Sequence, residues 1–173
     1  MRWREPIEWL MLIAAAVALI AFGAAASPAV QANLLIVVAG WAAVKTGYYF
    51  AENLKHLQDA TAQDLAYHKF VVLLAYNMAQ ITLSFALDFY CLVRIDRGSL
   101  NGIDPALAGG ELLFECFYFS VLNFSFFGYG DITPAHIPGK VIMLLEVVTA
   151  FSTVIFLLSD FVSMKESMRR KGP

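Results

Sequence analysis

The sequence predicts an all-α integral membrane protein with four spanning helices and a re-entrant segment between the third and the fourth. Of its 173 residues, 60% are hydrophobic and only 15% are charged, against roughly 25% charged in an ordinary soluble domain. The mean hydropathy of +0.65 leaves too little polar surface for a water-soluble globule. A net charge of −2 provides no basic excess for a phosphate backbone, so we expect no nucleic-acid partner.

Four apolar stretches approach the length of about 20 residues that a helix needs to cross a bilayer. They cover residues 9–26, about 29–50, about 70–93 and about 141–162. Ser27-Pro28 separates the first two, because proline ends a helix at or just before itself. Between the second and third, residues 52–69 carry charges of both signs, with apolar positions that suit a helix lying at the membrane surface.

The Lys and Arg residues indicate the orientation, because they gather on the cytoplasmic side of membrane proteins. With a cytoplasmic N-terminus, most of them lie inside, and Arg94, Arg97 and Lys140 lie outside. We therefore expect a multi-pass protein of the cell (inner) membrane, with N- and C-termini in the cytoplasm. An alternative is that residues 1–26 form a cleaved secretory signal, which would remove one span and leave the others as oriented.

The segment between the third and fourth stretches does not fit a spanning helix. The polar residues 94–110 are followed by the apolar run 112–127, which is too short to span and breaks at Gly128-Tyr129-Gly130-Asp131. This pattern indicates a re-entrant helix over about 111–124, followed by a returning loop.

The segment ELLFECFYFSVLNFSFFGYGDITP, residues 111–134, resembles the pore loop of the potassium channel family. The similarity rests on Tyr118-Phe119-Ser120, on the Gly-Tyr-Gly-Asp motif and on Pro134, with Gly139-Lys140 and Glu146 downstream, and it extends over about residues 70–164. The resemblance implies a pore helix, a selectivity filter and an inner helix. It divides the chain into a peripheral helix pair (1–54), a cytoplasmic linker (55–69), a pore domain (70–164) and a basic cytoplasmic tail (165–173).

The resemblance implies a channel in which backbone carbonyls replace the hydration shell of an ion. The potassium ligands would be the carbonyls of Phe126, Phe127, Gly128 and Tyr129, and the filter would continue through Gly130 and Asp131. Turning successive carbonyls to one axis requires left-handed backbone, which glycine adopts freely, so we expect it at Gly128 and Gly130. Tyr129 is expected to pack against Phe117 or Tyr118, and Asp131 to add negative charge at the outer mouth.

Two residues depart from the family pattern at the inner end of this filter. Phe126 occupies a position that is usually Thr, whose hydroxyl helps to form the innermost ion site. Phe127 replaces a Val or Ile. The four phenyl rings at position 126 either narrow and dry the cavity mouth or tuck sideways with the loss of one site. Asn123, often Thr in the family, is a smaller departure.

Several ionisable side chains have candidate roles in or near the membrane. We expect Glu115 and Glu146 to brace the filter, through a hydrogen-bonded or protonated contact, together with Tyr118. Depth along the helices argues against an ion pair between Lys45 and Asp88. Lys45 is then expected to reach the inner headgroups or Glu52, and Asp88 to meet an outer cation, Arg94 or Lys140. Cys91 and Cys116 are expected to be buried thiols.

The sequence therefore predicts a homotetrameric, potassium-selective channel in the lipid bilayer, because one pore loop per chain requires four copies to encircle an ion. Potassium is the permeant ion, and we expect no organic cofactor, no enzymatic activity and no regulatory domain in this chain. One alternative is a weakly selective or sodium-permeable channel, and another is a non-conducting subunit with the pore fold. A transporter would need repeated halves, which the sequence lacks.

Overall fold

The computed structural model describes residues 27–60 and 67–170, and these residues are almost entirely helical. The helices are α2 (Pro28–Ala60), α3 (Tyr67–Ile95), α4 (Gly109–Phe124) and α5 (Ile137–Arg170), and the short strands are β1 (Leu100–Asn101) and β2 (Thr133–Pro134). The expected first spanning helix, 9–26, lies outside the described residues.

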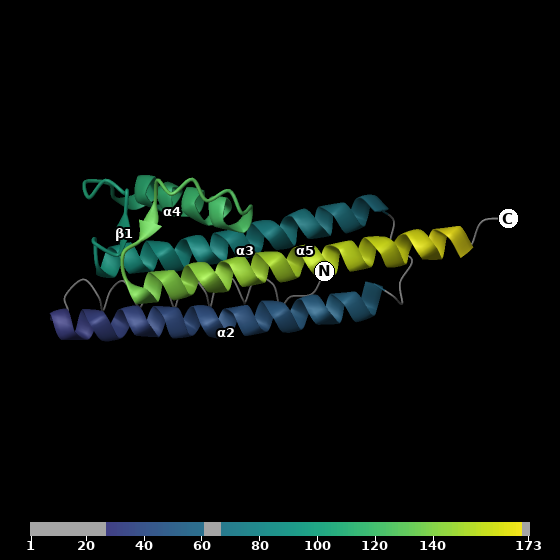
Figure 1. The fold of residues 1–173 in the computed structure, drawn as a ribbon, viewed down its shortest axis with the longest axis horizontal. Coiled ribbons are helices and arrows are strands. Elements are labelled where there is room, and N and C mark those ends of the chain that lie inside the picture. Colours follow the sequence, from purple (N-terminus) through teal and green to yellow (C-terminus); the bar gives the residue numbers. More distant parts are fainter. Residues whose placement is uncertain (1–26, 61–66, 171–173) are drawn as a thin grey trace.

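Three long helices lie side by side, and the shorter α4 lies against one half of α3 (Figure 1). Within the described part of the chain, three helical segments are long and apolar enough to cross a membrane: Ala29–Ala51, Ala75–Ile95 and Ile137–Phe156. α4 falls between the second and third of these segments, as expected for a re-entrant helix. The prediction of an all-helical membrane fold is thereby confirmed.

The helix boundaries differ from the sequence expectations at two places. α2 runs to Ala60, so residues 52–60 continue the second helix instead of belonging to a separate surface helix. No proline or glycine interrupts the sequence there, and the apolar pattern alone does not mark the end of a helix that leaves the bilayer. α5 starts at Ile137, with Pro138 in its first turn, where the missing N–H costs nothing, and continues to Arg170. Most of the expected tail is therefore helical.

The core gathers along one face of α3. Ile81, Phe85, Phe89 and Leu92 are fully buried and recur every three or four residues, which places them on one stripe of the helix. The Phe89 ring meets the Phe119 ring of α4 edge-on, with 4.7 Å between the ring centroids. This contact fixes α4 against α3.

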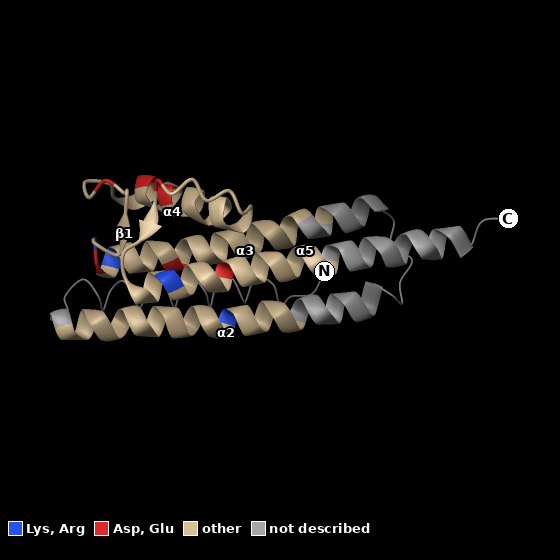
Figure 2. Cartoon of the chain, in the orientation of Figure 1, with Lys and Arg blue, Asp and Glu red and all other residues tan. Residues whose placement is uncertain are grey.

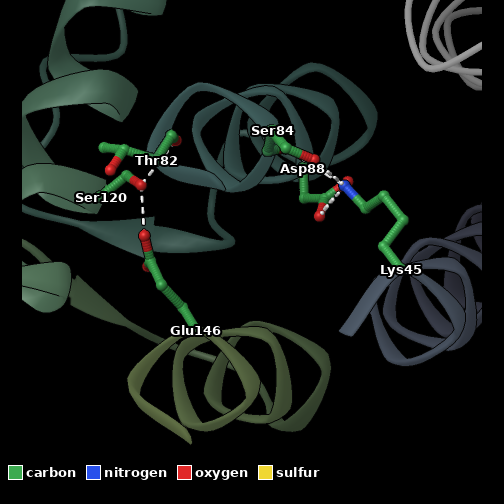
Figure 3. Close-up of polar contacts among 6 residues, drawn as sticks. All are labelled: Lys45, Thr82, Ser84, Asp88, Ser120 and Glu146. Carbon is green, nitrogen blue, oxygen red and sulfur yellow. Dashed lines mark hydrogen bonds and ion pairs between the residues drawn. The ribbon is translucent and has the colours of Figure 1, made fainter. Parts of the chain in front are cut away.

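Among the residues that Figure 2 colours, the charged ones concentrate at the end that holds β1 and the start of α4, and the middle of the helices carries few. One of these few interior contacts contradicts the sequence expectation. The Nζ atom of Lys45 lies 2.5 Å from Oδ2 of Asp88, and both side chains are 7% exposed (Figure 3). Lys45 does not reach the headgroups, and Asp88 pairs with neither Arg94 nor Lys140.

The physical reason for this pair lies in the directions of the side chains. Because α2 extends to Ala60, Lys45 lies near its middle and not near its inner end. Side chains lean toward the N-terminus of their helix, and α2 and α3 run in opposite directions (Figure 1). Lys45 therefore leans outward and Asp88 inward, which closes the difference in depth.

Candidate ion pathway

α4 ends in a tightly closed turn from which the chain doubles back. At its C-terminus the Ser125 hydroxyl donates to the Val121 carbonyl at 2.7 Å, and the amide of Phe127 donates to the Leu122 carbonyl at 2.8 Å. Residues 125–131 then return alongside α4 toward β2 (Figure 1). The helix thus ends partway along α3, and the partial negative charge of its C-terminus lies beside the returning segment.

The backbone of the returning segment is left-handed at two positions. Gly130 has a φ of 77° and Phe126 a φ of 60°. Left-handed backbone was expected at Gly128 and Gly130. The expectation was correct for Gly130 and wrong for Gly128, which does not have a positive φ. Phe126 takes the conformation instead, at a cost of about 1–2 kcal/mol for a side chain with a β-carbon. The departure from the family pattern at position 126 therefore coincides with the inner bend of the segment.

All six residues from Phe126 to Asp131 are exposed in the single subunit. The ring of Tyr129 contacts Phe127, with 5.9 Å between the centroids. Among the described residues it makes no ring contact with Phe117 or Tyr118, so the expected packing on the aromatics of α4 does not occur within the single subunit. A phenyl ring at position 127, where the family usually has a smaller aliphatic group, offers Tyr129 a nearer aromatic partner.

Tyr118 holds the outer end of the segment. Its hydroxyl donates to Oδ2 of Asp131 at 2.8 Å, and Oδ1 of the same carboxylate accepts from the Ile132 amide at 2.9 Å. The hydrogen bond to Asp131 raises the pKa of Tyr118 above its ordinary value. The phenol therefore remains a neutral donor, and both oxygens of Asp131 are engaged.

A buried polar cluster joins α3, α4 and α5 behind the segment. The Ser120 hydroxyl is in a short hydrogen bond with Oε1 of Glu146 and lies 2.8 Å from the Thr82 carbonyl (Figure 3). The Asn123 amide donates to Oε2 of Glu146 at 3.2 Å. All four residues are buried, so the cluster fixes α5 to α4 and α3.

Not every candidate from the sequence enters this cluster. Glu115 is half-buried on α4, and its carboxylate makes no hydrogen bond within the described residues. Ser120, Thr82 and Asn123 were not expected to form one site with Glu146. Serine and asparagine within an apolar helix were the available signal, because such groups must find partners inside a membrane. Cys91 and Cys116 are buried thiols that form no disulfide, as expected.

Phe126 lies against the inner helix. Its ring is edge-on to Phe151 of α5, with 6.2 Å between the centroids and an interplanar angle of 78°. The residue is nevertheless 52% exposed. The ring of Phe126 thus contacts α5 and is still about half exposed in the single subunit.

Comparison with known proteins places this geometry in a family. Residues 81–166 match the family described as ion channel. These residues belong to the ion channel family. The match begins within α3, contains the whole of α4 and the returning segment, and ends in α5. The ion channel family is not an enzyme class.

A potassium channel is among the relatives of this ion channel domain. Over 127 residues the chain is 29% identical to two-pore potassium channel 4 from Arabidopsis thaliana, an alignment that covers 70% of this chain and 42% of the relative. The chain thus spans less than half the length of that relative. The resemblance to the potassium channel family is confirmed. No solved structure matches the chain.

Proposed function

We propose that this chain forms a homotetrameric, potassium-selective channel. The observation that carries the proposal is a short helix that stops partway along α3, followed by a Gly-Tyr-Gly segment that returns with left-handed backbone at Gly130. One such segment cannot surround an ion, and the sequence contains it once. Four copies arranged around an axis close the ring.

Potassium would cross this ring on the backbone carbonyls of Phe126, Phe127, Gly128 and Tyr129. These oxygens replace the water molecules around the ion. The six residues that would line the axis are all exposed in the single subunit, and the filter continues through Gly130 and Asp131. The carboxylate of Asp131 adds negative charge where cations arrive.

Support for the filter comes from two of the three residues expected to brace it. Tyr118 holds Asp131 at the outer end, and Glu146 ties α5 to α4 through Ser120 and Asn123. Both contacts restrict how far the pore helix moves relative to the filter. We keep Glu115 as a bracing candidate for contacts between subunits, because its carboxylate is not engaged within the described residues.

We propose that the filter lies on the outer side of the membrane. α3 ends, α4 begins and α5 begins at the same end of the molecule (Figure 1), and the Lys and Arg distribution of the sequence assigns that end to the outside. The N- and C-termini then lie in the cytoplasm, and residues 70–164 form the pore domain. In this proposal residues 1–54 are the peripheral helix pair, residues 55–69 are the cytoplasmic linker and residues 165–173 are the basic cytoplasmic tail.

Ion flux in liposomes tests the proposal. Purified protein is reconstituted, and uptake is measured under potassium, sodium and large-cation gradients. We expect potassium flux well above sodium flux, and a particle with fourfold symmetry by electron microscopy. Equal potassium and sodium flux would instead support a weakly selective channel.

A second candidate function is a non-conducting subunit that keeps the pore fold for assembly. Phe126 favours it, since the ring lies at the inner bend and removes the hydroxyl ligand of the innermost site. A ring of four phenyl groups also excludes water from the path. The Phe126→Thr variant separates the two candidates: flux that appears only in this variant identifies the native chain as non-conducting.

A further inference from the structure

The loop between α3 and α4 is ordered by its own hydrogen bonds. Nη1 of Arg97 donates to the Leu107 carbonyl at 2.7 Å, which closes the loop across ten residues. The Gly98 amide donates to Oδ1 of Asp96 at 2.9 Å. A loop closed in this way presents its middle residues at a fixed place.

The middle of this loop pairs with the chain directly after the filter segment. β1 and β2 are antiparallel, with Leu100 opposite Pro134 and Asn101 opposite Thr133. The side-chain amide of Asn101 lies 3.5 Å from the Thr133 hydroxyl. Leu100 is 3% exposed, so the pair is anchored in the core. The loop therefore holds the chain two residues beyond Asp131.

Gly102 brings the loop into contact with the filter segment itself. It has a φ of +89°, and a Cβ added there would lie 1.9 Å from the carbonyl oxygen of Asp131 and 2.9 Å from its carbonyl carbon. Real Cβ atoms never approach a backbone atom so closely. Only glycine allows this approach, both by its conformation and by its lack of a side chain.

We propose that Gly102 is a positioning residue for the filter, through which the α3–α4 loop sets the place of its outer end. Asp131 is then held from two sides, by the Tyr118 hydroxyl from α4 and by the backbone of Gly102 from the loop. A carbonyl ring binds an ion only where its oxygens are fixed, and these two contacts fix the residue at the outer end of the segment. The expected effect of Gly102 on ion selectivity rests on the proposed channel function. The contact between Gly102 and the Asp131 backbone does not depend on conduction.

The test compares two glycines that both have a positive φ and differ in surroundings. Gly109 has a φ of +56° with nothing within 4 Å of an added Cβ. Gly102→Ala and Gly109→Ala therefore both place a side chain on left-handed backbone, and only the first displaces Asp131. In liposomes we expect Gly102→Ala to lower the potassium-to-sodium flux ratio at least fivefold, and Gly109→Ala to change it less than twofold.

Amide hydrogen exchange over residues 128–132 gives a readout that needs no conduction. We expect exchange at least threefold faster in Gly102→Ala than in Gly109→Ala. If the native chain does not conduct but this difference is present, the channel proposal fails and the positioning role stands. If the native chain is selective and the two variants agree in flux ratio and in exchange, the positioning role is overturned.

A second variant covers the case in which Gly102→Ala does not assemble. One glycine inserted between Asn101 and Gly102 loosens the contact without adding bulk, and surface loops tolerate such insertions at small entropic cost. Its control is one glycine inserted between Ala108 and Gly109. Faster exchange over residues 128–132 in the first insertion alone supports the proposal, and equal exchange in both insertions contradicts it.

Discussion

Lys45 and Asp88 form a buried ion pair that joins α2 to α3. The ammonium group also lies 2.9 Å from the Ser84 hydroxyl and 3.2 Å from the Ser84 carbonyl, so all three of its protons have acceptors. Its Nζ atom is 5.6 Å from the centroid of the Phe85 ring. A charge buried this fully is tolerated only because it is paired and hydrogen-bonded.

Removing one partner of this pair leaves a buried charge without compensation. We expect Lys45→Met or Asp88→Leu alone to destabilise the protein by roughly 3–5 kcal/mol, measured as the midpoint of unfolding in SDS. The double variant is expected to cost less than either single variant, because no charge is then left unpaired. Additive effects in the double variant would show that the two residues act independently.

The buried cluster around Glu146 allows a prediction from counting protons. The Ser120 hydroxyl has one proton, yet it lies between the Thr82 carbonyl, which only accepts, and the Glu146 carboxyl group. A Glu146 in its acid form donates to Ser120, which then donates to Thr82. We therefore expect the carboxyl group to be protonated, with an infrared band that Glu146→Gln removes.

The same count of hydrogen-bond donors and acceptors predicts which substitutions at Glu146 are tolerated. The amide of Glu146→Gln donates to Ser120 and accepts from Asn123, so we expect thermal stability close to that of the native protein. Glu146→Leu leaves the Asn123 amide without a partner, at a cost of about 1–3 kcal/mol. If Gln were as damaging as Leu, the side chain would have to be an ionised carboxylate.

Tyr118→Phe removes the hydroxyl that holds Asp131. We expect the variant to assemble normally and to lose selectivity by severalfold in the potassium-to-sodium flux ratio, because the outer carbonyls are then less fixed. Tyr76→Phe on α3 is the control, since Tyr76 is 46% exposed and remote in sequence from the pore helix. Equal potassium-to-sodium flux ratios in the two variants would show that the Tyr118 hydroxyl does not support the filter.

Phe126→Thr returns the hydroxyl that the family usually has at the innermost ion site and removes a ring from the inner bend. We expect potassium flux to increase, because a ligand is gained and a dry constriction is lost. Phe114→Thr is the control, since Phe114 is 65% exposed on α4. An unchanged or lower flux in Phe126→Thr would mean that the ring does not limit conduction.

The sequence predicted the helices of the fold because hydropathy dominates membrane insertion. It located α4 to within two residues of its observed start, since the run 112–127 is too short to span and ends at glycine. It missed the end of α2, because a helix that leaves the bilayer continues in polar sequence. It also missed β1 and β2, because strands of two residues carry no periodicity.

The polar contacts of the interior were the least predictable part. An estimate of depth from residue counts put Lys45 and Asp88 at different levels in the membrane. The two side chains meet because each leans toward the N-terminus of its helix and the two helices are antiparallel. The role of Glu146 was anticipated in outline, but its partners on α3 and α4 depend on how three helices pack. The left-handed backbone at Phe126 contradicts local preference, so no single-residue rule predicts it.

The flux of potassium against sodium through the native protein in liposomes, with the large-cation gradient as the leak control, tests the central claim most directly. We expect potassium to enter well ahead of sodium and the large cation to be excluded. Equal passage of potassium and sodium, or no flux in either the native protein or Phe126→Thr, would contradict the claim that four copies of residues 126–131 form a potassium filter.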